Sequence, residues 1–231
     1  MKKSHIFFFI FLILLADQAL KFYIKTTYAH GEEHLVFGHW FRLHFVENEG
    51  MAWGWKFGNS GSWGKLALTI FRLIAVIFGV FYINKIIKQK LSKGFIICVG
   101  LIFAGAAGNL IDSMFYGLIF DKSCDQNTLA DCSEVAKAFA GQHYGTFLHG
   151  KVVDMLYFPI IDSHYPQWVP WLGGKEFEFF SPVFNIADAS ISMGLIIILL
   201  FQKRFFKQQD GANGHPTVET KTTVNDEVQI S

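Results

Sequence analysis

Four long runs of apolar residues alternate with polar segments along the chain. They cover about residues 6–24, 66–87, 94–115 and 183–201. Each run is close to the length of about 20 residues that an α-helix needs to cross the hydrocarbon core of a bilayer. The pattern therefore predicts a mainly α-helical membrane protein, in which residues 1–207 form a single four-span domain and residues 208–231 form a polar tail.

The first apolar run has an alternative interpretation as a cleaved secretory signal, because Lys2 and Lys3 precede an apolar core. We expect a retained membrane helix instead. Asp17 and Gln18 interrupt the run, and no convincing small-residue cleavage site follows it. A lipoprotein signal is excluded, because no Cys lies near this segment.

Basic residues gather at alternate ends of the runs, which predicts how the helices are oriented. The basic clusters are Lys2, Lys3, Lys85, Lys88, Lys90, Lys93, Lys203, Arg204 and Lys207. Because Lys and Arg are enriched on the cytoplasmic side of membrane proteins, we expect both termini and the polar tail to be cytoplasmic. Residues 25–65 and 116–182 carry far fewer basic residues for their length and should be extracytoplasmic.

The two outer segments differ in pattern. Within residues 34–57, aromatic and β-branched residues recur with a rough period of two, most clearly from Trp40 to Val46. This predicts a small β-rich element that lies on the membrane, with Trp side chains at the interface. Residues 157–182 contain Pro159, Pro166, Pro170 and Pro182 and are expected to form an irregular interfacial loop.

Residues 118–150 form a polar, acidic insertion whose function the sequence does not reveal. The insertion contains Cys124 and Cys132. If it lies outside the cytoplasm, these cysteines could form a disulfide, although only the distance between their Cα atoms decides this. Cys98 lies within an apolar run and is expected to behave as a small hydrophobic residue.

The composition excludes several classes of protein. With 52% hydrophobic residues, 26 Phe and a mean hydropathy of +0.31, the chain is too apolar for an ordinary soluble domain of 231 residues. A net charge of +1 provides no basic field for nucleic acid. The metal-site spacings HExxH and CxxC do not occur. We therefore expect no nucleic-acid partner and no metal site.

The polar residues inside three of the apolar runs lie at one depth, toward the outer surface. They are Asp17, Lys21, Asn109, Asp112, Asn185 and Asp188. Each successive pair is three or four residues apart, so that its side chains project from one helix face. Because ionisable residues in spanning helices are costly, we expect these faces to line a common functional cleft. Arg72 in the second run is the exception, and we expect its side chain to extend to the lipid headgroups.

A cleft that contains two carboxylates limits the possible chemistry. Asp154, in the second outer segment, is an acid that the cleft can bring to Asp188. Two Asp side chains a few ångströms apart cannot both ionise, so they share a proton. One can deprotonate water while the other protonates the carbonyl under attack, which is aspartic proteolysis. No His lies in any apolar run to activate Ser190 or Ser192 as a nucleophile.

A non-enzymatic membrane protein, such as a proton-coupled carrier or a scaffold subunit, is the alternative function. Transporters are usually built on internal repeats with charged residues near the bilayer midplane, and neither feature occurs in the four runs. Taken alone, Asp188 would also suit a structural role near a helix N-terminus, and Asp154 would suit an exposed loop. The functional interpretation therefore depends on the two acids as a pair.

Five blocks of sequence, in order, resemble the signature blocks of one membrane peptidase family. The blocks are Asp17–Lys21, Asn48–Gly54, Gly105–Asp112, Val152–Asp154 and Phe184–Asp188. Together they resemble lipoprotein signal peptidase, or signal peptidase II, over nearly the whole chain from Asp17 to Gly194. Any single block would be weak evidence, but five in the family order are specific.

The resemblance implies an aspartic endopeptidase of the bacterial inner membrane that cleaves the signal peptide of diacylglyceryl-modified prolipoproteins before the lipidated cysteine. It implies that Asp154 and Asp188 are catalytic and that no cofactor is needed. The supporting residues that it implies are Asp17, Lys21, Asn48, Gly50, Asn109, Asp112, Asn185 and Ala187. We expect the protein to act as a monomer among membrane lipids.

The chain departs from the family pattern at three places. Ser113 stands where the family usually has Arg, so any contact of that Arg is absent or supplied elsewhere. Trp53 replaces a usual Phe, and the insertion at residues 118–150 lengthens the segment before Asp154. None of these departures removes a predicted catalytic group.

Overall fold

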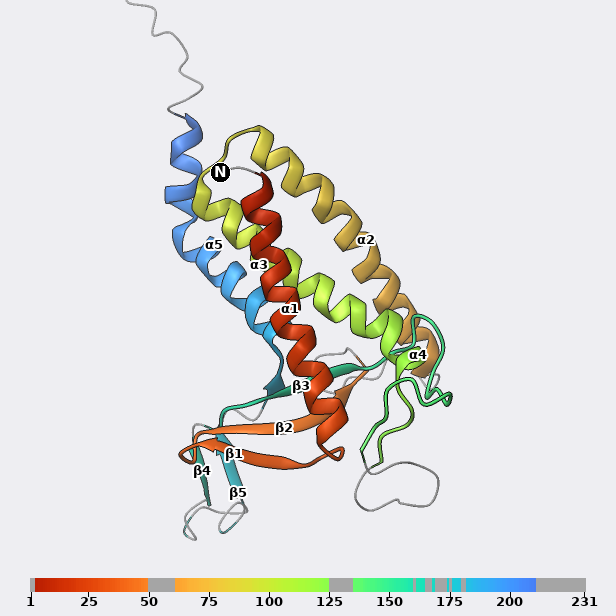
Figure 1. Cartoon of the computed structure of the whole chain (residues 1–231). Helices are drawn as coiled ribbons and strands as arrows, with labels where there is room; N and C mark the ends of the chain where they lie inside the picture. The colour runs from red at the N-terminus through yellow and green to blue at the C-terminus, as the bar shows by residue number, and fades with distance from the viewer. Residues whose placement is uncertain are drawn as a thin grey trace, which may run out of the picture.

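Helices and strands occupy opposite ends of the molecule (Figure 1). The computed structural model describes residues 3–49, 61–124, 135–159, 161–164, 168, 174, 176–179 and 182–210. The strands gather at one end of the helical bundle, and the N-terminus and the connection between α2 and α3 lie at the other. The predicted site residue Gly50 and the departure at Trp53 lie outside the described residues.

The four predicted membrane helices are confirmed. They are α1 (Lys3–Thr27), α2 (Gly61–Lys88), α3 (Lys93–Ile111) and α5 (Ile186–Asp210). Each contains a stretch that is long and apolar enough to cross a membrane. The fourth helix begins later than residue 183, because Val183 and Phe184 form the short strand β6 and hydrogen-bond to a neighbouring strand.

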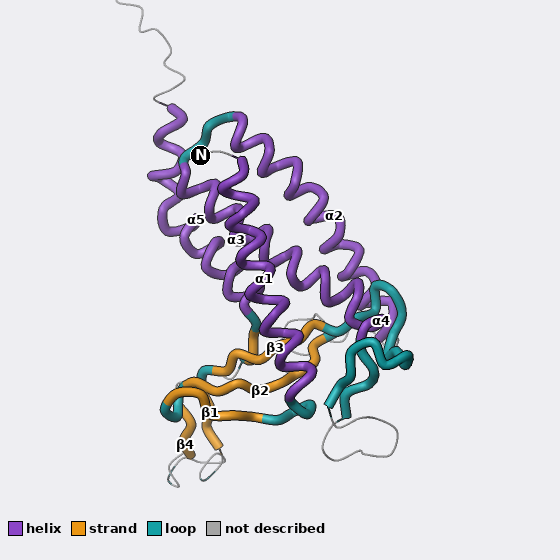
Figure 2. The backbone as a smooth tube through the Cα atoms, in the orientation of Figure 1, coloured by secondary structure: helices purple, strands orange, loops and turns teal. Residues whose placement is uncertain are grey.

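Helix α3 is the centre of the bundle and packs against α1, α2 and α5 (Figure 2). Half of the apolar stretch of α3 that could cross a membrane is buried inside the protein. The corresponding share for α2 is only 11%. The contact with α5 is close because α3 has glycine there. A Cβ atom on Gly105 would lie 2.2 Å from the carbonyl oxygen of Ala187. The small residues of the Gly105–Gly108 block therefore bring the two helices together beside the predicted site.

A four-stranded antiparallel sheet confirms the predicted β-rich element. Its strand order is β1 (Glu33–Phe37), β2 (Phe41–Asn48), β3 (Val152–Tyr157) and β6 (Val183–Phe184). In the register of β2 and β3, Val46 faces Asp154. Strand β6 leads into α5 after one residue, so that the sheet and the bundle are directly connected.

The predicted irregular loop at residues 157–182 is partly wrong. It contains β4 (Ile161–His164) and β5 (Glu176–Phe179), which pair in antiparallel fashion. The alternation Glu-Phe-Glu-Phe in β5 has the period of a strand, and the prolines obscured this signal. Trp168, which stands between the two strands, is 81% exposed.

The described parts of the insertion fold back onto the end of α3. After α3, a π-helical turn (Asp112–Tyr116) and α4 (Gly117–Ile119) continue the helix. Backbone N–H groups of Gly145 and Gly150 donate to the carbonyl groups of Gly117 and Ser113. Cys124 is disulfide-bonded, and its predicted partner Cys132 lies outside the described residues.

Candidate active site

The last turn of α3 holds the centre of the site. Asn109 and Asp112 are three residues apart and both are almost fully buried. The π-helical turn begins at Asp112, and such turns are frequent at functional sites. Backbone N–H of Val153 on β3 donates to Asp112 Oδ2 over 3.4 Å. The end of α3 is thereby joined to the sheet.

Lys21 of α1 is fully buried and uses all three of its N–H donors in the site. Its Nζ lies 2.9 Å from Asp17 Oδ2 and 2.7 Å from Asp112 Oδ2. It also donates to Asn109 Oδ1 over 2.9 Å. A buried ammonium group is tolerated only when it is paired and hydrogen-bonded, and these three oxygens meet that need.

The bond from Lys21 determines which way the Asn109 amide points. Because the amide oxygen accepts from Lys21, the amide nitrogen faces the opposite way. Asn109 Nδ2 donates to Asp188 Oδ1 over 2.7 Å. Lys21 thus acts on Asp188 through Asn109, although it does not bond to that acid.

Asn185 connects the two candidate catalytic acids. It precedes α5, and its Oδ1 accepts from the backbone N–H of Asp188 over 2.8 Å, which is the bond of a helix N-cap. Its Nδ2 donates to Asp154 Oδ1 over 2.7 Å and contacts Asn109 Oδ1 at 3.2 Å. Asn185 therefore holds Asp154, Asn109 holds Asp188, and these two asparagines contact each other.

Asp154 lies on β3 and is only 3% exposed. Besides the bond from Asn185, its Oδ2 accepts from Asn48 Nδ2 on β2 over 3.1 Å. Burial first, and then the negative charge of Asp188, raise the pKa of Asp154 to about 7. Asp154 is therefore poised to exchange a proton near neutral pH, and part of the shift comes from its electrostatic coupling to Asp188.

Asp17 and Ala187 fasten the start of α5 to α1. Asp17 Oδ1 accepts the backbone N–H of Ala187 over 2.9 Å, where a carboxylate also interacts favourably with the helix dipole. Ala187 is fully buried, and its Cβ would lie 3.2 Å from a Cβ built on Gly108. A larger side chain at either position would separate the helices that carry Asn109 and Asp188.

The structure brings together every predicted site residue that it describes: Asp17, Lys21, Asn48, Asn109, Asp112, Asp154, Asn185, Ala187 and Asp188. Gln18 was missed by sequence reasoning. Its Nε2 donates to Asp112 Oδ1 over 2.8 Å, and its Oε1 accepts from Tyr116. Gln18 is a polar residue beside Asp17 inside an apolar run, and this position could have indicated a role in the site.

Arg72 of α2 does not follow the expectation that it extends to the headgroups. Its Nη1 donates to Ser113 Oγ, in the π-helical turn after α3, over 3.3 Å. The side chain therefore reaches toward the end of α3, where Asp112 and Asn109 lie. The apolar pattern around Arg72 gave no sign of this partner, because Ser113 is distant in sequence.

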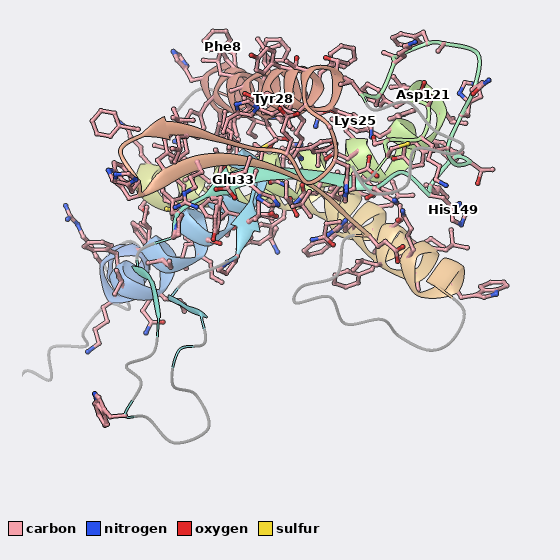
Figure 3. The ribbon with its side chains drawn as sticks, turned by 90° about the horizontal axis from the view of Figure 1, so that it is seen from below. Phe8, Lys25, Tyr28, Glu33, Asp121 and His149 are labelled. Carbon is pink, nitrogen blue, oxygen red and sulfur yellow. The ribbon has the colours of Figure 1, made fainter. Side chains whose placement is uncertain are left out.

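A second buried lysine, Lys25, lies one turn after Lys21 and was also missed. It pairs with Glu47 of β2, and the rings of Phe45, Phe120 and Tyr144 lie 5.0–5.7 Å from its Nζ. Seen from the sheet end, Lys25 lies between the strands and the segment that carries Asp121 (Figure 3). Within the described part of the chain, no three His, Cys, Asp or Glu side chains are grouped so as to hold a metal ion.

Comparisons with known proteins show which family the chain resembles. Residues 9–204 match the family model described as signal peptidase (SPase) II. A lipoprotein signal peptidase of Porphyromonas gingivalis is 45% identical over 197 residues, which cover 84% of this chain and 81% of that protein. The lipoprotein signal peptidase of Amoebophilus asiaticus is 33% identical over 203 residues, or 85% of this chain and 77% of that protein.

The solved structures agree in fold. A bacterial membrane enzyme solved by the in meso method at 1.9 Å resolution has a TM-score of 0.54 and 24% identity, and the likeness covers 87% of this chain and 93% of that one. A second such structure, at 2.3 Å resolution, has a TM-score of 0.53 and 22% identity, with 96% of each chain covered. By its family model and its relatives, the chain belongs to the signal peptidase II family of membrane peptidases.

Proposed function

We propose that the chain is an aspartic endopeptidase that removes the signal peptide of diacylglyceryl-modified prolipoproteins by cutting before the lipidated cysteine. Asp154 and Asp188 are its catalytic residues. The observation that carries this proposal is the hydrogen-bonded link between the two acids. Asn185 donates to Asp154, which is buried. Asn109 donates to Asp188, and the two amide side chains contact each other. The names of its relatives support the substrate class.

The surroundings of the two acids suggest a division of roles. Asp154, with its pKa raised to about 7, is the group that holds the shared proton. Asp188 lies in the first turn of α5, where the helix dipole favours a negative charge. Asp188 accordingly acts as the general base and Asp154 as the general acid.

In the proposed reaction, Asp188 and Asp154 carry out all proton transfers. Asp188 takes a proton from water, the water oxygen attacks the scissile carbonyl carbon, and Asp154 gives its proton to the carbonyl oxygen. The C–N bond then breaks as Asp188 returns its proton to the leaving nitrogen and Asp154 recovers one from a hydroxyl group. The asparagines hold the two carboxyl groups in place for both steps.

We place the protein in the bacterial inner membrane, with the catalytic pair on the extracytoplasmic side and both termini in the cytoplasm. The basic residues Lys85, Lys88 and Lys93 stand at the connection of α2 and α3, which lies at the end of the bundle away from the sheet (Figure 1). Asp154 belongs to the sheet at the other end. We expect a monomer to be sufficient for activity.

Substitution of each acid tests the catalytic pair. Asp154→Asn and Asp188→Asn, each purified as the full chain, should abolish cleavage of a lipidated precursor while membrane insertion is unchanged. Glu33→Gln, which removes a carboxylate on β1 that pairs with Arg42, is the matched control and should cleave at the normal rate. Normal cleavage by either Asp variant would remove that acid from the proposed mechanism.

Two further measurements test the substrate class and the chemistry. The wild-type protein should cleave a precursor that carries the diacylglyceryl group and leave the same precursor without lipid uncut. Cutting that is independent of the lipid would contradict the substrate assignment, even if proteolysis is observed. Treatment with EDTA should leave activity unchanged, and loss of activity with rescue by a divalent ion would point to a metal enzyme.

A further inference from the structure

One face of α2 is polar near the end of the helix that lies beside the sheet. Lys65, Thr69 and Arg72 follow one another at intervals of four and three residues and so project from one side. Lys65 and Thr69 are buried, although α2 is the least buried of the four spanning helices. Thr69 Oγ1 lies 3.2 Å from the carbonyl oxygen of Leu148 in the insertion. The start of this face is therefore buried, and Thr69 packs against the insertion.

Arg72 is tied to the turn of α3 that holds the site. Its Nη1 donates to Ser113 Oγ over 3.3 Å, and Ser113 Oγ in turn donates to the backbone carbonyl of Asn109 over 2.9 Å. Ser113 is only 2% exposed. The guanidinium group is thus held beside the residue whose amide binds Asp188. Ser113 is also the position at which the chain lacks the Arg of the family pattern.

Three carboxylates lie within electrostatic range of Arg72. They are Asp188 on α5, Asp112 at the end of α3 and Asp154 on β3, and Asp188 interacts most strongly. From its own helix, the Lys65 ammonium group also faces Arg72. Behind Asp112 lie the ion-paired side chains of Lys21 and Asp17. The guanidinium group therefore faces mainly negative charge.

A second cation would stabilise the charge of the catalytic pair. Lys21 forms its ion pairs with Asp17 and Asp112. The catalytic pair carries a negative charge of its own when its two acids share one proton. Because charge in a buried site is costly unless it is paired, a cation beside the pair stabilises its ionised form. Arg72 is a cation on the described part of the chain whose interactions include both catalytic acids.

We propose that Arg72 is a positioning residue for the reaction, and that it acts by stabilising the negative charge shared by Asp154 and Asp188. Ser113 holds its guanidinium group in place. This inference rests on the proposed aspartic mechanism. It predicts that Arg72 determines the pH range of activity, because a nearby positive charge favours the ionised form of each acid and lowers the pH at which it forms.

The pH profile of kcat/KM for a lipidated precursor tests the inference. The profile has two limbs, the rise of kcat/KM on the acid side and its fall on the alkaline side. In Arg72→Met both limbs should move to higher pH by about one unit, so that kcat/KM on the acid side should fall about tenfold. Arg72→Lys keeps the charge and should move the limbs less. Lys85→Met, which removes an exposed cation at the opposite end of α2, is the matched control and should leave the profile unchanged.

Ser113 gives a second test that does not depend on the Met variant being stable. Ser113→Ala should move both limbs in the same direction as Arg72→Met, but by less.

The outcomes separate this inference from the proposed function. If Arg72→Met and Ser113→Ala lower the rate equally at every pH without moving the limbs, Arg72 is only structural and the inference fails, while the catalytic pair stands. If Asp154→Asn or Asp188→Asn retains normal activity, the aspartic mechanism itself fails. Movement of the limbs in the Lys85→Met control would show a general charge effect and would also overturn the inference.

Discussion

Lys21 and Lys25 stand one turn apart on α1, and both are fully buried, but they belong to different regions of the molecule. Lys21 bonds to two carboxylates and one amide in the site. Lys25 bonds to one carboxylate, Glu47, which also pairs with Lys151, the residue just after the insertion. The first lysine orients Asn109, which binds the candidate catalytic residue Asp188. Lys25 connects α1 to the sheet and to the insertion.

The difference shows that a buried charge takes its role from its partners. All three oxygens around Lys21 lie on elements of the site, so its loss would disturb chemistry and stability together. The surroundings of Lys25 are largely aromatic, with Phe45, Phe120 and Tyr144 facing its Nζ. Its loss should disturb mainly the attachment of the sheet. The following predictions test this contrast, from the largest effect to the smallest.

Lys21→Met should have the largest effect. It leaves Asp17 and Asp112 as uncompensated buried carboxylates, which costs about 3–5 kcal/mol of stability. It also frees the Asn109 amide to rotate away from Asp188, and a misplaced group of this kind lowers kcat/KM by about 100-fold. Thermal unfolding and cleavage of a lipidated precursor measure the two effects. Full activity in this variant would contradict the role of Lys21 in orienting Asn109.

Lys25→Met should reduce stability more than activity. The substitution leaves the buried carboxylate of Glu47 without its Lys25 partner, which lowers the stability of the fold by about 1–3 kcal/mol. We expect kcat/KM to fall by less than about tenfold, because the effect reaches Asp154 only through Asn48, which follows Glu47 on β2. The double variant Lys25→Met/Glu47→Leu should recover most of the lost stability. Failure of the double variant to recover any would show that the aromatic contacts of Lys25 dominate.

The pH dependence of stability should also separate the two regions. The folded pKa of Asp154 is raised to about 7 from 3.8, so its contribution to stability is complete below pH 3.8 and is lost as pH rises through about 7. Burial raises the pKa of Glu47, but Lys25 and Lys151 together lower it to about 2. The contribution of Glu47 is therefore constant above its ordinary pKa of 4.5 and is lost only toward pH 2.

Stability of the wild type should consequently decline between about pH 4 and 7, by at most about 1.4 kcal/mol per pH unit for one group. Apparent melting temperatures in detergent at pH 4, 5, 6 and 7 measure this decline. Asp154→Asn should remove that part of the slope, and Glu33→Gln should leave it unchanged. An identical slope in Asp154→Asn would show that other groups cause the decline.

The helices and most of the sheet were predictable because their signals are local. Apolar runs of spanning length and a period of two depend only on neighbouring residues, which is why α1 and β2 match their predictions. The ends were less predictable. Val183 and Phe184 are apolar enough to continue the helix, and only pairing with β3 makes them a strand.

The candidate site was predictable as a set of residues but not as a network. The spacing of Asp17 and Lys21 gave one ion pair, whereas the bonds of Lys21 to α3 join residues about 90 positions apart. Arg72 and Lys25 were missed for the same reason. Their partners, Ser113 and Glu47, are distant in sequence, and no periodic pattern marks such a pair.

Lys151→Met should have the smallest effect of these variants, although Lys151 shares its acid with Lys25. Its side chain is 37% exposed, and its Nζ lies 3.1 Å from Glu47 Oε2. Water and salt screen such a pair, so we expect a loss below about 1 kcal/mol that shrinks further at high ionic strength. Thermal unfolding at low and high salt measures it, and a loss equal to that of Lys25→Met would contradict the contrast. Because both lysines bind one carboxylate, the difference between them then comes from the burial of Lys25 and from the aromatic rings around it.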